Sequence, residues 1–511
     1  MTTTVRDSSA AAAPPAPRGP RGMPRGPRGI PRVAWLCALI AAVNALAWSF
    51  FIPPFHVPDE TAHFAYIQYL GEKGTPPKHP FAGFSRDENQ TLGALGFYTT
   101  IGNRNARVAT GPLMRQQLAK VERAHYSRVS RSDAGSATNN PPLYYAVGAV
   151  IYDIAPTGDA VLDRLPWLRA LSALLAAATV LCTFLFIREL LPGSRWAWPL
   201  GALAATFQPV FGFIAGGVQV DNALDLCTAG LMLAIAITLR RGLTWKRGVA
   251  VGLVLAAGLL VKTTMIAFAP AAAVAILLAA WRAREDRRAV LSGVGAAAVA
   301  LGVPVLIFIG LSKGVWHRPI AGAADAIAAT RTAATPNLRE QLVYSWQSFL
   351  PRLGFMKNEF PTMSYPGWDL YWRGLVGRFG WLDYDFPLWV SWVCLGLGAT
   401  VVAAAVSGLV RLRGLMRGRW AEFGVYVLAV LGLLATITVA GYRARLQSPT
   451  GQIFEQARYL LPLLPIYGAL VAVGARALGR RWGAALGGLV VMASLALTIF
   501  GQVLTVSRYY G

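Results

Sequence analysis

Charged residues are scarce in this chain of 511 residues, and acids are scarcer than bases. Only 14% of the residues are charged, 55% are hydrophobic, and 48 Lys and Arg outnumber 24 Asp and Glu. A chain with so few charged residues cannot cover the surface of a soluble domain of this size. The composition therefore excludes an ordinary soluble globular protein.

Cysteines are few, and the motifs of soluble nucleotide enzymes are missing. The four cysteines all lie in apolar stretches, which argues against a disulfide framework or a thiolate metal site: Cys37, Cys182, Cys227 and Cys394. The sequence has no Walker loop, no dinucleotide-binding glycine pattern, no HExxH zinc motif and no nucleophile elbow. Chemistry on a soluble nucleotide therefore has no support.

Long apolar runs are abundant instead. Runs of about 20 residues match a hydrocarbon layer about 30 Å thick, and their continuous rather than alternating pattern indicates helices and not barrel strands. We predict an all-α polytopic membrane protein with one integral membrane domain, 33–511. Its predicted bundle has about eleven transmembrane helices, at 33–52, 165–187, 196–214, 220–239, 248–261, 264–281, 289–312, 386–410, 423–440, 459–475 and 483–505.

Lys and Arg in the short connections indicate the orientation, because such residues collect on the cytoplasmic side. We predict a multi-pass protein of the cell membrane with its N-terminus in the cytoplasm and its C-terminus outside. This placement explains the net charge of +24 without nucleic acid. Every inner connection is then basic: Arg188 and Arg195; Arg240, Arg241, Lys246 and Arg247; Arg282, Arg284, Arg287 and Arg288; Arg411, Arg413, Arg417 and Arg419; Arg476, Arg480 and Arg481.

The hydrophilic segments divide into a tail and three outer loops. Residues 1–32, rich in Ala, Pro, Gly and Arg, are predicted to be a disordered cytoplasmic tail. The outer loops are expected at 53–164, 313–385 and 441–458. The first has enough apolar and aromatic residues to form helices at the membrane surface. One such helix is expected within Asn139–Ile154, where two prolines suit a helix start.

The clearest candidate for chemistry follows the first span, in the segment FIPPFHVPDETAHFAYIQYL. Pro58 suits the first position of a helix, which places Asp59 and Glu60 in its first turn and His63 on the same face. Three interpretations stay open: an acidic turn that complements the helix dipole, a metal site formed by Asp59 and His63, and a catalytic carboxylate at the outer surface. We favour catalysis, with Asp59 and Glu60 as the candidate acids.

Further polar residues are expected on the same membrane face as Asp59. Asp221 and Asn222 open the fourth span, Lys262 lies between the fifth and sixth, and Arg458 and Tyr459 begin the tenth. The two cations beside a carboxylate suit a phosphate or pyrophosphate at the level of the lipid headgroups.

Each of these cations also has a structural interpretation. The Lys262 ammonium can extend to the membrane interface while its stem stays apolar. The Arg458 side chain can form a salt bridge with Glu455 instead of binding a substrate.

Aromatic residues gather in Ser364–Trp389. Trp and Tyr often anchor helices at the membrane interface, and their ring faces also stack on sugars. Trp368, Trp372 and Trp381 are therefore candidates for either role.

Several segments resemble one family when they are taken in order. VPDETAHF, NNPPLYY, the Asp-Asn after the third span, GLLVKTT, GRFGWLD and QARYLLPLLP are similar to motifs of the bacterial membrane protein family DUF 2142. That family is grouped with the GT-C superfamily of membrane glycosyltransferases, which includes protein O-mannosyltransferases and aminoarabinose transferases. The resemblance covers roughly residues 50–470.

The resemblance implies a GT-C-like bundle and an inverting glycosyltransferase. It would take a sugar from a polyprenyl-phosphate donor at the outer face and pass it to a glycan, lipid or protein acceptor. Asp59 would be the catalytic carboxylate, and Arg458 and Lys262 would contact the donor phosphate. No cofactor is certain, although a divalent cation could join Asp59. The remaining candidates for substrate binding are His63, Asn140, Asp221, Asn222 and Tyr459.

Two other classes of function remain. A lipid or polysaccharide transporter or flippase would place ionisable groups or broken helices near the middle of the bilayer. A non-catalytic envelope-assembly protein would tolerate replacement of Asp59. The spans carry almost no charge, and the polar residues gather at one face, which favours chemistry at the membrane surface.

Overall fold

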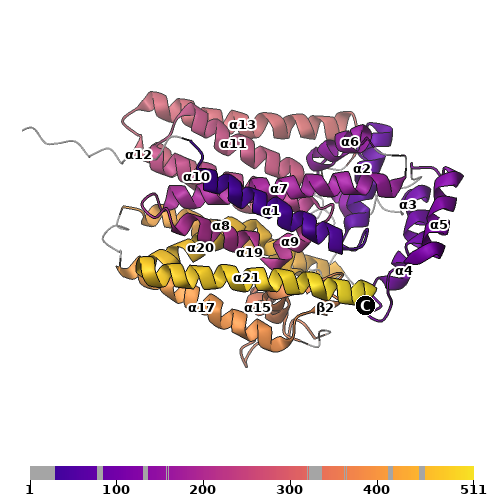
Figure 1. The fold of residues 1–511 in the computed structure, drawn as a ribbon. Coiled ribbons are helices and arrows are strands. Elements are labelled where there is room, and N and C mark those ends of the chain that lie inside the picture. The colour runs from indigo at the N-terminus through magenta and orange to yellow at the C-terminus, as the bar shows by residue number, and fades with distance from the viewer. Residues whose placement is uncertain are drawn as a thin grey trace, which may run out of the picture.

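The computed structural model describes residues 29–77, 84–129, 136–156, 158, 160–318, 320, 337–361, 363, 365–411, 418–447 and 455–511 (Figure 1). The tail predicted to be disordered lies outside these ranges up to residue 28. Arg413 and Arg417, and much of the third predicted outer loop, also lie outside them.

Apolar helices form most of the described chain, because only helices satisfy the backbone of such sequences in lipid. They are α1 (Arg32–Phe51), α7 (Val161–Leu190), α8 (Ala197–Thr206), α9 (Pro209–Ala215), α10 (Val220–Arg241), α11 (Trp245–Val261), η2 (Thr263–Phe268), α12 (Ala269–Arg282), α13 (Arg287–Gly314), α17 (Leu388–Arg411), α19 (Trp420–Gln447), η3 (Ala457–Leu463), α20 (Leu464–Ala477) and α21 (Gly479–Tyr510).

These helices account for the predicted spans. Among the described residues, nine helices are long and apolar enough to cross a membrane, and the bent pair α8–α9 raises the number to ten. The remaining predicted span, 248–261, is α11, whose 17 residues make a helix about 26 Å long that packs along α13. The chain is thus an all-α polytopic membrane protein.

Shorter elements lie in the predicted outer loops. They are α2 (Glu60–Lys73), α3 (Arg86–Ala94), α4 (Phe97–Thr100), α5 (Gly111–Ala124), η1 (Ser136–Asn139), α6 (Leu143–Ile154), α15 (Leu338–Phe349), α16 (Gly367–Gly377) and the antiparallel strands β1 (Arg378–Phe379) and β2 (Tyr384–Asp385). The helices predicted in the first loop are therefore present. The one expected after Asn139 is α6, with Pro142 as its N-cap.

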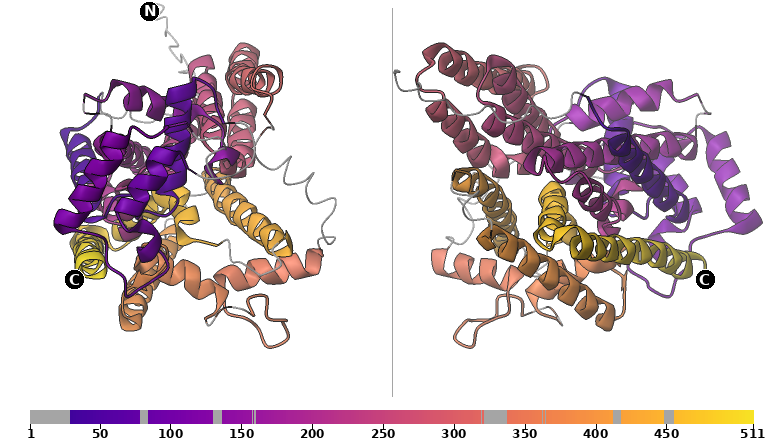
Figure 2. Two further views of the ribbon diagram at one scale, coloured as in Figure 1. Left: turned by 90° about the vertical axis from the view of Figure 1, so that its right-hand side faces the viewer. Right: turned by 60° about the vertical axis from the view of Figure 1, so that its left-hand side comes forward.

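The bundle has two chemically different ends. α2 to α6 and the C-terminus lie at one end, which we call the Asp59 end (Figure 1). Successive spans alternate in direction, so the described residues of the predicted basic connections lie at the opposite end, which we call the arginine end. Figure 2 (left) faces the Asp59 end, which the helices of the first loop share with α15 and α16. The cellular side of each end stays a prediction.

Small residues bring the spans close together. At Gly248 and Gly252 of α11 an added Cβ would collide with the backbone of α13, at Gly293 and Ala297 respectively. Without a hydrophobic drive between helices in lipid, such close backbone contact is a main source of association. α10 lies among α7, α11 and α12, and most of its residues are buried.

Three of the spans are broken near the Asp59 end. α8 and α9 meet at an angle of 59°. Gln208 stabilises this break, because its Oε1 accepts from the Phe211 amide at 2.6 Å and its Nε2 donates to the Leu375 carbonyl at 2.7 Å. The other two breaks are the 3₁₀ helices η2 and η3, which begin directly after Lys262 and Gln456. Polar side chains can collect at such irregular turns.

Candidate functional site

Four segments that are distant in sequence meet at the Asp59 end and join their charges. Arg458, near the start of η3, forms an ion pair with Asp59 and places its Nε 3.8 Å from Asp221 Oδ2. The Lys262 Nζ, at the junction of α11 and η2, lies 2.5 Å from Asp221 Oδ1. The order Asp59–Arg458–Asp221–Lys262 gives a chain of alternating charge, which we call the charge chain.

Asp59 differs from the sequence expectation in its backbone. It is not in the first turn of the helix but is the N-cap of α2, with φ 62° and ψ 6°, in the left-handed region. The Pro58 carbonyl explains this: it accepts hydrogen bonds from Gln219 and from Arg458, so it does not take part in a helix. A residue other than glycine is strained in this conformation, and such strain persists only where the surrounding structure holds it.

Asp59 is also the most accessible member of the charge chain. Its side chain is 32% exposed, against 6% for both Arg458 and Asp221 and 18% for Lys262. A substrate that enters this site can therefore reach the Asp59 carboxylate first. The buried Arg458 and Asp221 side chains fix the position of Asp59 from the protein interior.

The surroundings of Asp59 favour its charged form. Burial acts to raise the pKa of this carboxyl, but the opposing effects of Arg458, by charge and hydrogen bond, and of His63 and Lys262 leave the pKa below its ordinary value. Asp59 is thus a carboxylate at neutral pH. Its basicity depends on how closely Arg458 stays bound to it.

Tyr459 lies between the two cations. The Lys262 Nζ and the Arg458 Cζ are each 5.5 Å from the centroid of its ring, a distance at which cations are attracted to an aromatic face. Lys262 is therefore directed into the protein instead of extending to the interface. Arg458 pairs with Asp59 and Asp221, whereas the sequence alone also allowed Glu455.

His63, Tyr145 and Asn140 form a hydrogen-bonded group beside the charge chain. The Tyr145 hydroxyl lies 2.9 Å from His63 Nδ1 and accepts from Asn140 Nδ2 at 3.0 Å. Burial lowers the pKa of His63 to about 4, although Asp59 and Asp221 act in the opposite direction. His63 is therefore neutral at pH 7, and its ring orients polar groups without adding charge.

Arg318 extends this group through stacked tyrosines. The rings of Tyr66 and Tyr145 stack at a centroid distance of 3.7 Å, and Arg318 donates to the Tyr66 hydroxyl at 2.8 Å. Arg318 also donates to the carbonyls of Thr138 and Asn140. The group thus fixes the first loop, through α2 and η1, against the segment that follows α13.

Glu60 lies in a different environment from Asp59. It is completely buried and accepts two hydrogen bonds from Arg169, at 2.8 and 2.7 Å, and a third from the Val218 amide. Arg169 also donates to the backbone carbonyls of Ser49, Ile52 and Pro53. These contacts join α7 to the turn between α1 and α2. The Glu60–Arg169 pair therefore stabilises the fold.

Asn222 and the tryptophans make their contacts away from the charge chain. Asn222 donates to the carbonyls of Ile214 and Gly217 and so holds the turn from α9 to α10. Trp372 donates to the Ser391 carbonyl of α17, and Trp368 packs against Trp392 of the same helix. These contacts suit anchoring; Trp381 is half-buried.

The donor set does not fit a resident metal ion. Within the described ranges, no group of three or more His, Cys, Asp and Glu side chains is arranged to hold one. The two acids of the site, Asp59 and Asp221, are each paired with a cation. Two carboxylates that are already paired with cations make a weak site for a divalent cation, which prefers several oxygen ligands.

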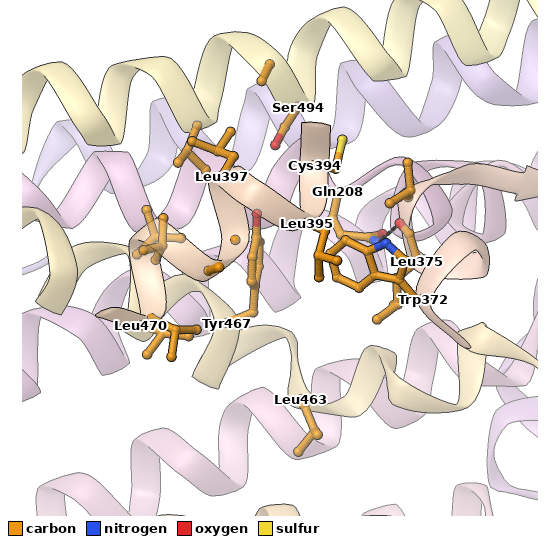
Figure 3. Close-up of a pocket in the computed structure, with 18 of the residues that line it drawn as sticks. Gln208, Trp372, Leu375, Cys394, Leu395, Leu397, Leu463, Tyr467, Leu470 and Ser494 are labelled. Atoms are coloured by element: carbon orange, nitrogen blue, oxygen red, sulfur yellow. Dashed lines mark hydrogen bonds between the residues drawn. The ribbon is translucent and has the colours of Figure 1, made fainter. Parts of the chain in front are cut away.

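An apolar cavity of about 970 Å³ lies next to η3 (Figure 3). Its lining comes from α16, α17, η3, α20 and α21 and includes Leu460 and Leu461, which follow Arg458 and Tyr459 in the chain. Trp372 and Gln208 close one side, and Tyr467 and Leu470 lie farther along (Figure 3). The lining is almost entirely hydrocarbon, so the cavity suits an alkyl or isoprenoid chain.

Sequence reasoning missed Arg169, Arg318, Tyr145 and Asp225 as parts of this end of the bundle. Arg169 had a usable signal, because it is an arginine inside the predicted span 165–187, where charge is rarely tolerated without a partner. Asp225, one turn after Asp221, had the same signal, since it is an acid inside the predicted span 220–239. Arg318 gave none, since it follows a span in an ordinary loop.

Comparison with solved structures shows likenesses in overall fold at low sequence identity. They include the S. cerevisiae protein O-mannosyltransferase Pmt1–Pmt2 complex bound to the sugar donor (14% identity, TM-score 0.36, covering 64% of this chain and 38% of that chain). The apo Archaeoglobus fulgidus oligosaccharyltransferase is similar at 12% identity and TM-score 0.42, covering 93% of this chain and 56% of that one. ArnT from Cupriavidus metallidurans bound to undecaprenyl phosphate is similar at 13% identity and TM-score 0.44, covering 94% and 77%.

The chain thus spans well under two thirds of the length of the first two of these proteins. No curated protein matches it. A family model described as predicted membrane protein (DUF2142) matches residues 43–467. That range covers most of the chain and includes all four members of the charge chain, so this protein belongs to the DUF2142 membrane protein family.

Proposed function

We propose that this protein is a glycosyltransferase that moves a sugar from a polyprenyl-phosphate donor to a hydroxyl group of a cell-envelope acceptor at the outer face of the membrane. The charge chain is the observation that carries the proposal. It joins an accessible carboxylate, Asp59, to two cations, Arg458 and Lys262, at one end of the helix bundle. A carboxylate beside paired cations is what transfer from a lipid phosphate requires.

The proposed reaction is a single displacement. The acceptor oxygen attacks the anomeric carbon, the bond between that carbon and the phosphate oxygen breaks, and the leaving phosphate keeps the electron pair. Asp59 takes the proton of the acceptor hydroxyl, since an alcohol is a poor nucleophile without a base. Arg458 and Lys262 stabilise the charge that develops on the phosphate. The leaving group needs no proton and the reaction needs no nucleotide.

The contact between Asp59 and Arg458 links donor binding to base strength. Arg458 and the nearby charges hold the pKa of Asp59 low, which makes the free carboxylate a weak base. A donor phosphate competes for the same guanidinium, because it also prefers two-point contact with arginine. Once Arg458 turns toward the phosphate, the pKa of Asp59 rises. The base thus becomes effective when the donor is present.

The apolar cavity beside η3 supports a lipid-linked donor. Leu460 and Leu461 line it directly after the cationic segment that begins with Arg458. A phosphate at the charge chain and an isoprenoid chain in this cavity would satisfy both parts of a polyprenyl phosphate. We assign the cavity to the lipid chain of the donor.

The decisive experiment replaces Asp59 with Asn and measures transfer of a radiolabelled sugar from polyprenyl phosphate by purified protein. Loss of the base should lower the rate about 10²- to 10⁴-fold, while donor binding and folding persist. The matched control is Glu122→Gln, which neutralises an exposed acid of α5. Full activity in Asp59→Asn would remove the catalytic assignment and favour a non-catalytic role.

A second candidate function, lipid transport, is favoured by Asp225 and the broken spans. Asp225 lies inside α10, is completely buried, and both its carboxylate oxygens lack a hydrogen-bond partner among the described residues. Ionisable groups and discontinuous helices are typical of transporters. Transport of a fluorescent polyprenyl phosphate across proteoliposomes would separate the two functions. Transport that survives Asp59→Asn but stops in Asp225→Asn would support the transporter.

A further inference from the structure

A second cavity, this one with a polar lining, lies at the arginine end of the bundle, opposite Asp59. It has a volume of about 430 Å³ and is lined by the loop between α7 and α8, the end of α17 and the turn between α20 and α21. Arg411, Arg476 and Arg480 line it, and its lining contains no Asp or Glu. We call this cavity the arginine pocket.

Backbone geometry brings the three arginines together. α20 ends at Ala477 and α21 begins at Gly479, whose φ of +79° allows a reversal that few other residues could make. Arg476 and Arg480 therefore lie on either side of a tight turn. The Gly408 position of α17 has no room for a Cβ beside Ala477, so α17 and α20 touch there. Arg411, one turn farther along α17, is thus held beside the turn.

The described residues around the pocket do not neutralise its positive charge. Arg476 donates to the buried Ser194 hydroxyl, which fixes its direction without balancing its charge. Throughout the part of the chain that the structure describes, no carboxylate lies within salt-bridge distance of Arg411, Arg476 or Arg480. Three cations around one cavity repel each other, and an anion in the cavity removes that repulsion. The first free amides of α21 add to the same field.

The helices around the pocket present hydrocarbon to the membrane. Val410 is exposed at the end of α17, and Trp482 and Leu489 are exposed on the first turns of α21. Trp is common where a helix crosses from lipid to headgroups. A ligand seated at the arginines would thus have its polar part in the pocket and apolar surface next to it.

We propose that the arginine pocket binds the headgroup of an anionic phospholipid, with its phosphate at the three guanidinium groups and its acyl chains along the exposed side chains of Val410 and Leu489. Basic pockets between transmembrane helices suit such headgroups, because arginine contacts phosphate oxygens at two points and the acyl chains stay in the bilayer. This site is separate from the charge chain and does not depend on the proposed transfer reaction. It would hold the α17–α20–α21 unit, which also lines the apolar cavity, in one arrangement.

The test measures lipid binding to purified full-length protein in neutral detergent by native mass spectrometry. The probes are phosphatidylglycerol and phosphatidylcholine with identical acyl chains, and inorganic phosphate and diphosphate. The test variant combines Arg411→Gln with Arg480→Gln, two exposed residues whose loss leaves the Arg476–Ser194 contact intact. The control combines Arg287→Gln with Arg288→Gln, which removes the same charge from exposed residues at the start of α13.

Phosphatidylglycerol should bind the wild type and the control at least about tenfold more tightly than phosphatidylcholine, and this preference should be lost in the test variant. Equal binding in the test and control variants would overturn the proposal, because general positive charge would then suffice. Binding of inorganic phosphate or diphosphate with no preference between the lipids would also overturn it. A competition between phosphatidylglycerol and diphosphate on the wild type gives the same answer without any variant.

Discussion

The carboxylates of Asp59 and Glu60 belong to different ion pairs although the residues are adjacent in the chain. Asp59 pairs with Arg458 and remains about one third exposed, whereas Glu60 pairs with Arg169 at two points and is completely buried. The left-handed conformation at Asp59 separates them. Consecutive acids therefore lie in different environments: the Asp59 carboxylate is accessible, and the Glu60 carboxylate is enclosed in the fold.

Replacing Glu60 with Gln should destabilise the protein more than any change at Asp59. It would leave the buried Arg169 guanidinium without a counter-charge, which typically costs about 3–5 kcal/mol. We expect a large fall in thermal stability, measured as the unfolding midpoint in detergent. Asp59→Asn should have a much smaller effect, because Asp59 is partly exposed and Arg458 keeps Asp221.

A double variant checks that the effect comes from the stranded charge. Glu60→Gln combined with Arg169→Met removes both charges and should recover part of the lost stability. If the double variant is less stable than Glu60→Gln alone, the backbone bonds of Arg169 to the α1–α2 turn matter more than the ion pair.

Replacing Lys262 with Met should impair donor use under the proposed reaction. One charge-assisted contact to phosphate is worth about 1.5–3 kcal/mol, so kcat/KM for the donor should fall about 10- to 100-fold. Arg458 still pairs with Asp221, and the fold should persist. Lys246→Met at the arginine end is the control and should leave kcat/KM unchanged. An unaffected kcat/KM in Lys262→Met would remove Lys262 from the donor site.

The membrane architecture was predictable because it depends on composition and length. A run of about 20 apolar residues has one stable form in lipid, so each predicted span appears as a helix or as a pair of helices. Asp59, Lys262 and Arg458 were expected to line one outward-facing cavity, and Asp221 was expected on the same membrane face. Which cation binds which acid depends on how the helices pack side by side, and no local pattern encodes that packing.

Local geometry was predicted less well. Pro58 suggested a helix start at that residue, yet helix α2 begins at Glu60. The reason is a pair of long-range contacts: the side chains of Gln219 and Arg458 donate hydrogen bonds to the Pro58 carbonyl, which is therefore not free to join a helix. The break between α8 and α9 was hidden for a similar reason. The predicted span 196–214 is apolar throughout, and Gln208 stabilises the bend through a carbonyl of α16.

Stability should fall on acidification because of two buried histidines. Burial lowers the pKa of both His56 and His63 to about 4 from an ordinary value of 6.5. Between these pH values the unfolded chain binds protons that the folded chain does not, so protonation favours unfolding. Each histidine should cost about 1.4 kcal/mol per pH unit as the pH falls from 6.5 to 4.

The measurement is the unfolding midpoint in detergent from pH 7.5 to pH 4.5. His63→Gln should flatten the histidine part of the curve by roughly half, because the contribution of His63 is removed and that of His56 remains. The Asp59 carboxylate acts in the same direction but at lower pH: because folding lowers its pKa, the unfolded chain binds the proton first, and stability is lost only below the ordinary carboxyl pKa of about 3.9. A curve of unchanged slope in His63→Gln would show that this imidazole is accessible to protons in the folded protein.

Arg508 near the C-terminus should hold the first loop in its folded conformation. Its Nε lies 2.8 Å from Asp383 Oδ2, and its other nitrogens donate to the carbonyls of Thr100, Asn103 and Ala106. Arg508→Gln would break these contacts and leave the largely buried Asp383 carboxylate without its ion pair. Limited proteolysis should then cut the loop around residues 97–129 at least about tenfold faster, because loops with fewer contacts open more often. Arg481→Gln, an exposed change at the other end of α21, is the control. Equal cleavage rates in the two variants would mean that packing around Tyr509, and not the Arg508 network, holds this loop on the bundle.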